Sequence, residues 1–249
     1  VVLALGTFAS AFAAPGDLDP GFGVVSSGLN YTDIFGLQGA DLGHALALQT
    51  DGAVVVAGES AGQFAVARYD ANGLLDTANF SAGAGVVTTT IVLSSTANAV
   101  AIQDDGMIVV AGSANDGVRD YFAVARYDTN GALDTAGFNV PFGYITSTLS
   151  AGSDVATGVV LQIDGKIVVA GYTASQFAVA RYTTTGALDT TTFNAPNGFR
   201  TLTIGVAANQ ANAVGLQSDG KIVVAGHADM GGSDDFVVAR FTTTGGLDT

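Results

Sequence analysis

The stretch LQIDGKIVVAG at residues 161–171 decides the fold, because it joins a turn dipeptide to a strand that is apolar on both faces. Its Asp164-Gly165 pair predicts a two-residue type I′ hairpin turn, since aspartate tolerates and glycine favours a positive φ. The apolar run that follows lacks the alternation of a half-exposed strand and predicts a strand covered on both sides. Nearly the same stretch, LQSDGKIVVAG, recurs at residues 216–226.

Four short sequence motifs recur along the chain in a constant order, which predicts tandem copies of a repeat of roughly 55 residues. The Leu-Asp tag occurs at residues 18–19, 75–76, 133–134, 188–189 and 247–248. Asp-Gly occurs at 51–52, 105–106, 164–165 and 219–220. Ala-Gly occurs at 57–58, 111–112, 170–171 and 225–226, and Arg followed by an aromatic residue at 68–69, 126–127, 181–182 and 240–241.

Each copy predicts four strands, which in the second copy are residues 85–93, 98–103, 107–112 and 121–127. Hairpin turns between them make the unit a four-stranded antiparallel meander with two faces to bury, as in a propeller blade. The fold class is therefore all-β, a β-propeller or an open propeller arc. A β-helix or other solenoid is the alternative, although its coils are shorter and lack hairpins within the repeat.

One repeat domain is expected over residues 15–249. Its four full copies are expected at about residues 18–74, 75–132, 133–187 and 188–246. The apolar third strands should be the most buried segments, and four copies followed by part of a fifth tag favour an open arc with further blades elsewhere in the protein. An aromatic residue at one blade position predicts packing between blades rather than a sugar-stacking platform. These residues are Phe64, Phe122, Phe177 and Phe236.

The combined motif resembles the delta-60 repeat of uncharacterised bacterial propeller proteins. The resemblance covers roughly residues 17–249 and is fullest in the third and fourth copies, whereas Ala53 and Met107 replace the lysine after Asp-Gly in the first two. It implies an exported or cell-surface protein with a propeller-like fold. It implies no particular activity, substrate or cofactor.

Composition excludes several functions. The chain has a net charge of −14 and only eight Lys and Arg, so it has no basic patch for nucleic acid or an anionic membrane surface. It has no cysteine, so a disulfide framework and a thiolate metal site are excluded. No later apolar run is long enough to span a bilayer, so no membrane insertion is expected.

The apolar run at residues 1–14 ends in the small-x-small pattern Ala11-Phe12-Ala13. It reads as the remnant of a secretory signal peptide, with a buried first strand as the alternative. We therefore expect a secreted, periplasmic or cell-surface protein.

Side chains for catalysis are few. His44 and His227 fall at different places in the repeat, and Glu59 is the only glutamate, so neither a histidine site nor a glutamate pair is expected. No catalytic residue, metal or cofactor is predicted. Two longer loops between the third and fourth strands are weak candidates for calcium, because they gather hard oxygen ligands. Their aspartates are Asp116, Asp120, Asp229, Asp234 and Asp235.

An arginine ends every fourth strand among apolar neighbours and requires a carboxylate partner. The hairpin geometry brings the Asp-Gly turn and the Leu-Asp tag to the same end of the blade, which predicts a structural clasp. The arginines are Arg68, Arg126, Arg181 and Arg240. The preferred partners are Asp76, Asp134, Asp189 and Asp248, and the second choices are Asp51, Asp105, Asp164 and Asp219. The rival interpretation makes the arginines a ring of ligand-binding cations.

The leading hypothesis is a non-catalytic exported scaffold that presents its variable loops to an unknown protein or glycan. The alternatives are a structural segment of a larger cell-surface protein and a propeller hydrolase or lyase with aspartates gathered at the axis. The lyase or hydrolase requires at least two carboxylates and a base within hydrogen-bond reach.

Overall fold

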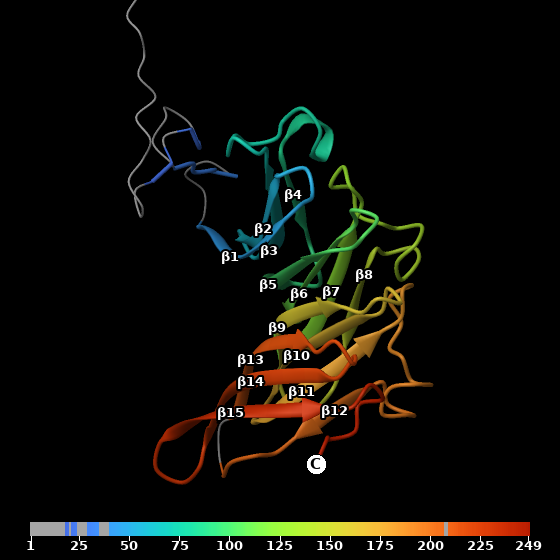
Figure 1. Cartoon of the computed structure of the whole chain (residues 1–249). Helices are drawn as coiled ribbons and strands as arrows, with labels where there is room; N and C mark the ends of the chain where they lie inside the picture. The colour runs from blue at the N-terminus through green and yellow to red at the C-terminus, as the bar shows by residue number, and fades with distance from the viewer. Residues whose placement is uncertain (1–17, 20, 24–28, 35–39, 207–208) are drawn as a thin grey trace, which may run out of the picture.

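The computed structural model describes residues 18–19, 21–23, 29–34, 40–206 and 209–249, so the expected signal segment lies outside the described residues. Four antiparallel sheets follow one another along the chain (Figure 1). Blade 1 holds β1 (Asp41–Leu48), β2 (Val54–Ser60), β3 (Gln63–Tyr69) and β4 (Val86–Thr89). Blade 2 holds β5 (Ser94–Ile102), β6 (Ile108–Asn115), β7 (Asp120–Tyr127) and β8 (Tyr144–Ser147). Blade 3 holds β9 (Asp154–Leu161), β10 (Ile167–Thr173), β11 (Gln176–Tyr182) and β12 (Phe199–Leu202), and blade 4 holds β13 (Asn209–Leu216), β14 (Ile222–Asp229) and β15 (Asp234–Phe241).

The sheets are offset from the sequence copies. Each was expected to begin after a Leu-Asp tag, but the strand after the tag joins the preceding sheet, so β4 pairs with β3 rather than with β5. The tag is a tight connection that bridges Leu75 to Tyr69 and returns the chain along the outer edge of β3. The predicted grouping of strands is therefore wrong by one strand, because local patterns do not show which neighbour a strand pairs with.

The Asp-Gly turn also differs from the prediction. The Gly106 N–H donates to the Gln103 carbonyl and the Gln103 N–H to the Met107 carbonyl, which leaves a loop of residues 104–106. Gly106 has φ 85° and Asp105 is absent from the residues with positive φ, so this is a type I turn followed by a left-handed glycine. The two-residue turn with positive φ lies instead between β2 and β3, at Ala61 and Gly62.

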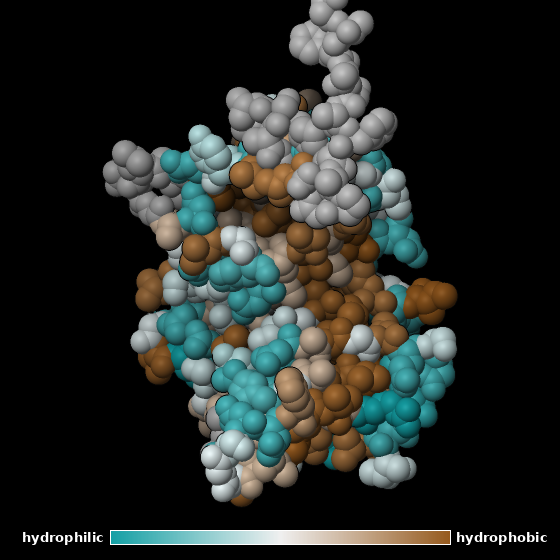
Figure 2. Space-filling view, turned by 60° about the vertical axis from the view of Figure 1, so that its left-hand side comes forward, coloured by the Kyte–Doolittle hydropathy of each residue, from teal (hydrophilic) through white to brown (hydrophobic). Residues whose placement is uncertain are grey.

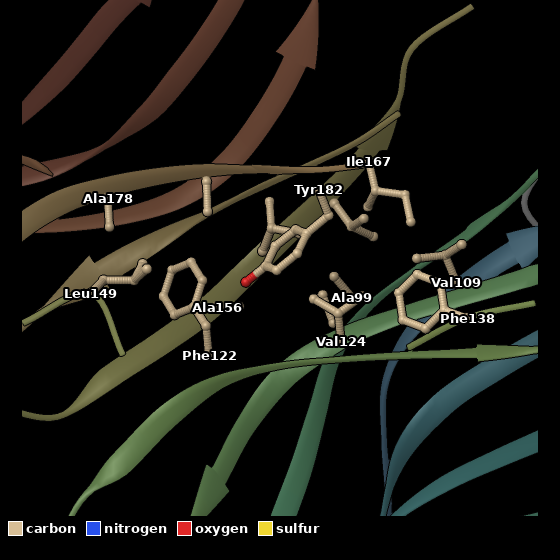
Figure 3. Close-up of a cluster of buried hydrophobic side chains, with 14 residues drawn as sticks. Ala99, Val109, Phe122, Val124, Phe138, Leu149, Ala156, Ile167, Ala178 and Tyr182 are labelled. Atoms are coloured by element: carbon tan, nitrogen blue, oxygen red, sulfur yellow. The ribbon is translucent and has the colours of Figure 1, made fainter. Parts of the chain in front are cut away.

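Hydrophobic clusters fill the spaces between successive blades. We call the side of a blade that faces the next blade its rear face, and the opposite side its front face. Between blades 2 and 3, Phe122 and Val124 of the rear face meet Ile167 and Tyr182 of the front face, and all four are fully buried (Figure 3). Strands that pack on both faces in this way need continuous apolar sequence, which explains the run in the third predicted strand.

The two ends of the stack are less buried than its middle. The segments 108–111 and 167–170 are buried throughout, as predicted. The equivalent segments 54–57 and 222–225 alternate between buried and half-buried residues, because within the described residues one face of blades 1 and 4 has no neighbouring blade. Contacts between elements link each blade to the next, and the sheets form an open stack with the two terminal blades at its opposite ends (Figure 1).

Apolar side chains are also exposed. Figure 2 shows them gathered in a strip along the length of the stack. Leu42, Leu46 and Leu48 of the edge strand β1 are exposed by about half or more. Among the described residues no helix is long and apolar enough to cross a membrane.

Candidate functional site

The arginine at the end of the third strand of each sheet lies against the Leu-Asp tag. In blade 3, the Nε and NH2 groups of Arg181 both lie 3.0 Å from Oδ2 of Asp189. The NH1 group of Arg181 donates to the Thr243 carbonyl of blade 4 at 2.7 Å, and its guanidinium carbon lies 4.7 Å from the centre of the Phe193 ring. The arginine therefore joins its own strand and the tag that follows it to a turn of the next blade.

The other oxygen of the tag aspartate organises the turn that follows. Oδ1 of Asp189 accepts the Thr192 N–H at 3.0 Å, and Oδ1 of Asp134 accepts the Gly137 N–H at 2.8 Å. Each carboxylate thus pairs with the arginine through Oδ2 and accepts a backbone N–H through Oδ1. In both Arg181 and Arg126, the Nε and NH2 groups share one carboxylate oxygen, Oδ2 of the tag aspartate.

All four arginines lie beside the aspartate that was the preferred partner. The pairs are Arg68 with Asp76, Arg126 with Asp134 at 2.7 Å, Arg181 with Asp189 at 3.0 Å, and Arg240 with Asp248 at 2.6 Å. Of the second choices, only Asp51 reaches an arginine, at 2.5 Å from Arg68. Asp164 and Asp219 instead lie 3.5 and 3.7 Å from Lys166 and Lys221, while Asp105 caps its own turn through the Met107 N–H. With a carboxylate on every arginine, the ring of free cations is not observed.

Electrostatics favour the ionised form of the tag aspartates. Burial of Asp189 opposes its charge, but hydrogen bonds from Thr192 and Lys166 and the charge of Arg181 outweigh it and hold the pKa of Asp189 below the ordinary value. Hydrogen bonds from Lys221 and Arg240 likewise lower the pKa of Asp248. A carboxylate held ionised by two cations is suited to structural pairing and not to proton transfer near neutral pH.

The calcium candidates do not come together. No group of three or more His, Asp or Glu side chains in the described part of the chain is placed to hold a metal ion. Asp116 accepts hydrogen bonds from the Tyr121 hydroxyl and from the N–H groups of Val118 and Arg119, and these lower its pKa to about 2. Asp120 accepts from Asn115 at 2.9 Å, and Asp229 caps its own loop through the Gly231 N–H. Asp234 and Asp235 are exposed on β15.

His44 and His227 lie inside strands, on β1 and β14. His227 lies 3.3 Å from Asn212 and 3.9 Å from Asp234, and His44 is exposed. Glu59 accepts a hydrogen bond from Thr96. These contacts do not assemble the carboxylates and base that a hydrolase or lyase requires.

One set of equivalent residues escaped the sequence analysis. The first strand of each sheet has a β-bulge, and the extra residue there is polar in every blade. These residues are His44, Asn98, Thr157 and Asn212. Asn98 donates to the Ala156 carbonyl at 2.8 Å and Thr157 to the Ala211 carbonyl at 2.6 Å, each in the next blade. All four lie five residues before the glutamine that precedes the Asp-Gly turn, at Gln49, Gln103, Gln162 and Gln217, so an alignment of the copies places them in one column.

The two rims of the stack differ. One rim, which we call the constant rim, carries the Asp-Gly turns and the tags. The opposite one, the variable rim, carries the hairpin loops 61–62, 116–119, 174–175 and 230–233 and the connections between blades. Loop 230–233 and the C-terminal tag lie on opposite sides of blade 4 in Figure 1. Blades 2 and 4 have four-residue hairpin loops here, whereas blades 1 and 3 have two-residue loops.

Antiparallel sheets, of four strands in blades 1 to 3 and three in blade 4, stack through their faces and repeat one clasp at the same rim, which defines a β-propeller repeat protein. The chain belongs to the DUF5122 beta-propeller family, a domain of unknown function whose model matches residues 49–78, 103–136, 162–191 and 217–249. Each matched segment runs from an Asp-Gly turn through the arginine to the tag, which is the portion that builds the constant rim.

Solved structures are similar to the chain at low identity. A protein of unknown function from Bacteroides caccae is 11% identical, with a TM-score of 0.45, over 80% of this chain and 56% of that one. A catalytically inactive virginiamycin B lyase from Staphylococcus aureus is 11% identical, with a TM-score of 0.43, over 85% of this chain and 72% of that one. The chain thus spans little more than half the length of the first. No match is found among the curated proteins.

Proposed function

We propose that this chain is an exported, non-catalytic scaffold of delta-60-type repeats that binds a protein or a glycan through its variable rim. The observation that carries the proposal is the contrast between the rims. On the constant rim, the arginine that ends each third strand is paired with the tag aspartate, whereas the variable rim differs in loop length from blade to blade. Loops that vary on a rigid repeat scaffold are where such proteins place their binding residues.

The hairpin loop of blade 2 has the character of a binding surface. Val118 is 88% exposed at its tip. The Arg119 guanidinium lies 4.7 Å from the centre of the Tyr121 ring, and Asp116 holds the loop through three hydrogen bonds. An aromatic residue and an arginine held in a fixed conformation lose little entropy on binding, which is why both residue types are enriched at the centres of interfaces.

Apolar residues beside this loop extend the same surface. The Leu93 N–H donates to the Asn115 carbonyl at 3.2 Å, which holds the connection between β4 and β5 against the base of the loop. Leu93 is 72% exposed there, next to the half-exposed Val92. Together Val92, Leu93 and Val118 offer apolar area beside polar groups, a combination that suits a protein segment or the apolar face of a sugar.

The apolar segment at residues 1–14 and the resemblance to delta-60 repeats support export. We place the protein outside the cytoplasm, in the periplasm, at the cell surface or in the medium.

A loop exchange tests the binding proposal. Replacing residues 116–119 by the Ala174-Ser175 pair of blade 3 removes the surface while keeping a hairpin turn that the scaffold already uses. Ligands are selected for the wild-type chain from a glycan array and a displayed peptide library. The exchanged variant is expected to lose them, while Lys221→Ala on the constant rim retains them.

Matched melting temperatures of the three proteins exclude unfolding as the cause. Retention of every selected ligand after the exchange would refute the variable rim as the binding surface. Failure to select any ligand from either library would favour a purely structural segment of a cell-surface protein.

A further inference from the structure

A lysine completes the clasp of blade 3. Lys166 follows the Asp-Gly turn, and its Nζ group lies 3.5 Å from Oδ2 of Asp164 in that turn and 3.3 Å from Oδ2 of the tag residue Asp189. The same Nζ group lies 3.3 Å from the Thr192 hydroxyl oxygen. We call these three acceptors, the turn aspartate, the tag aspartate and the residue three positions after the tag aspartate, the ammonium cradle.

Blade 4 holds a lysine between the same two carboxylates. The Nζ group of Lys221 lies 3.1 Å from Oδ2 of the tag residue Asp248 and 3.7 Å from Oδ2 of Asp219 in the turn. A lysine ammonium is a compact charge with three donors, which suits acceptors that surround one point. The cradle is therefore a feature that the constant rim repeats.

Blade 1 keeps the cradle but lacks the lysine, because Ala53 stands at that position. The Ala53 N–H donates to Oδ1 of Asp51 at 2.9 Å, as the Lys166 N–H donates to Oδ1 of Asp164 at 3.2 Å, so the two turns have the same local structure. The cradle residues of blade 1 are Asp51, Asp76 and Asn79. Blade 1 thus presents the acceptors without the cation that they hold in blade 3.

A hollow of about 380 Å³ lies at this place, between blades 1 and 2. Hollows of about 300–1,000 Å³ are the usual size of small-ligand sites. From blade 1 its lining includes Ala53 and all three cradle residues, and from blade 2 it includes the turn residues Thr129 and Asn130. The space that adjoins Ala53 is therefore bounded by the groups that contact the Lys166 ammonium in blade 3.

The charges around the hollow are unbalanced. Among the described residues that line it, Arg68 is the one basic side chain, whereas Asp51, Asp70 and Asp76 are acidic. In blade 3 the position of Asp70 is taken by the neutral Thr183, and the two cradle aspartates contact both an arginine and a lysine. Excess negative charge in a concave site attracts a cation.

Arg68 also adopts a different arrangement from its equivalents. Arg126 and Arg181 each place Nε and NH2 on the tag aspartate and donate from NH1 to a turn carbonyl of the next blade at 2.7 Å. Arg68 instead donates from NH1 to Asp76 and from NH2 to Asp51 at 2.5 Å. One arginine thus spans the two carboxylates that an arginine and a lysine share in blade 3.

Blade 2 shows that loss of the lysine alone does not produce this arrangement. Met107 replaces the lysine there, yet Arg126 still donates to the Thr184 carbonyl of the next blade, and Asp105 caps its own turn through the Met107 N–H. Methionine supplies an unbranched side chain at this position, whereas Ala53 supplies only a methyl group. Among the three blades with a described neighbour behind them, blade 1 therefore combines a complete cradle with the smallest side chain beside it.

We propose that the hollow between blades 1 and 2 binds a primary ammonium group on an unbranched carbon chain, as in a lysine side chain or an alkyl diamine. The ammonium takes the place of Lys166 Nζ, between the carboxylates of Asp51 and Asp76. Arg68 then adopts the arrangement of Arg181 and donates to the Thr129 carbonyl. This site lies on the constant rim and is independent of the binding proposed for the variable rim.

A primary ammonium fits the hollow better than a guanidinium or a metal ion. A guanidinium is a planar fork, and Arg68 already supplies one to the same two carboxylates. A metal ion requires several ligands that converge on one point, and no such group of His, Asp or Glu is found in the described part of the chain. An ammonium requires only acceptors at about 3 Å and can keep a remaining donor in water.

Nuclear magnetic resonance of the isotope-labelled full chain tests the proposal with two probes, the peptide acetyl-Gly-Lys-Gly-amide and the diamine cadaverine. Saturable shifts are expected for the amide signals of Ala53 and Asn130, on the two sides of the hollow. The same peptide with norleucine in place of lysine should shift neither signal, since it keeps the carbon chain without the charge. Tighter binding of the lysine peptide would support a partner protein as the source of the amine, and tighter binding of cadaverine would support a free amine. Saturable shifts with calcium and with neither amine would overturn the proposal in favour of a metal site.

Three variants locate the binding. Ala53→Lys should abolish the shifts and raise the melting temperature, because the chain then fills the cradle as blade 3 does. Asp51→Asn should weaken binding about fivefold, the loss expected for a solvent-exposed ion pair, while its Oδ1 still caps the turn. Asp104→Asn is the matched control, since Asp104 is an exposed aspartate of the blade 2 turn, and it should bind as the wild type does. The proposal is overturned if the wild type shows no saturable shift, or if folded Ala53→Lys and Asp51→Asn bind both probes as tightly as the wild type.

Discussion

Arg181 and Arg240 hold the same place in the repeat but have different surroundings. The side chains of Arg181 and Asp189 are 5% and 2% exposed, whereas those of Arg240 and Asp248 are 47% and 20% exposed. A buried ion pair leaves an uncompensated charge when one partner is removed, while an exposed pair is largely replaced by water. The contribution of the clasp to stability therefore depends on whether another blade covers it. Blade 4 covers Arg181, whereas Arg240 is exposed.

Arg181→Ala is expected to lower the free energy of unfolding by about 3 kcal/mol, because the buried Asp189 carboxylate then keeps only one of its two cations, Lys166 at 3.3 Å. Arg240→Ala is expected to lower it by less than about 1 kcal/mol. Denaturant unfolding followed by circular dichroism measures both. Equal losses in the two variants would show that burial does not set the strength of the clasp.

The lowered pKa of Asp189 makes the stability of the clasp depend on pH. A carboxylate whose pKa is lower in the folded state binds fewer protons there than when unfolded, so it stabilises the fold above the unfolded pKa of about 3.9. That contribution is lost as the pH falls toward the lower folded pKa. Asp189→Asn should therefore be less stable at neutral pH and lose less stability on acidification than the wild type. A pH series of denaturant midpoints tests this, and parallel curves for the two proteins would contradict it.

At the scale of single elements, the β-bulge of each first strand requires a glycine opposite it. A Cβ on Gly112 would lie 1.9 Å from the Thr96 carbonyl oxygen, and one on Gly171 would lie 2.0 Å from the Val155 carbonyl oxygen. The same approach recurs at Gly58 and Gly226. The repeated Ala-Gly motif thus reflects a close approach of two backbones and not a turn.

Gly112→Ala is expected to destabilise the chain by about 1–3 kcal/mol or more, because the methyl group forces β5 and β6 apart. Gly215→Ala, also within a strand, should be neutral or slightly stabilising, since a Cβ there has nothing within 4 Å. Thermal unfolding of the two variants measures the difference. Similar melting temperatures would mean that the bulge adjusts without cost.

At the scale of the whole molecule, stability should be uneven along the stack. The core strands of blades 2 and 3 pack on both faces, whereas β14 and β15 of blade 4 pack on one. In a linear repeat array each unit contacts only its neighbours, so terminal units open at lower free energy than central ones.

Hydrogen exchange followed by mass spectrometry should find peptides from β6 and β10 more protected than those from β14 and β15. Uniform protection of all four blades would indicate a single cooperative unit rather than a graded array.

The repeat, the all-β class, the strands and the partner of each arginine could be predicted from the sequence, because each depends on local pattern or on residues joined by one hairpin. Asp189 lies only eight residues after Arg181, and the tag must turn back beside the strand it follows. The turn type and strand grouping could not be predicted. Whether Asp105 adopts a positive φ and whether β4 joins β3 or β5 depend on the contacts of the assembled sheet.

Sequence by itself determined what every blade shares, since the same repeated motifs produce the same strands, turns and clasps. Only the tertiary structure decided what makes one blade differ from another. Phe177 and Phe236 occupy the same place in the repeat, yet one is sealed between blades and the other is exposed. The physical reason is that burial belongs to a pair of surfaces, and a repeat pattern does not specify which copies have a neighbour to pack against.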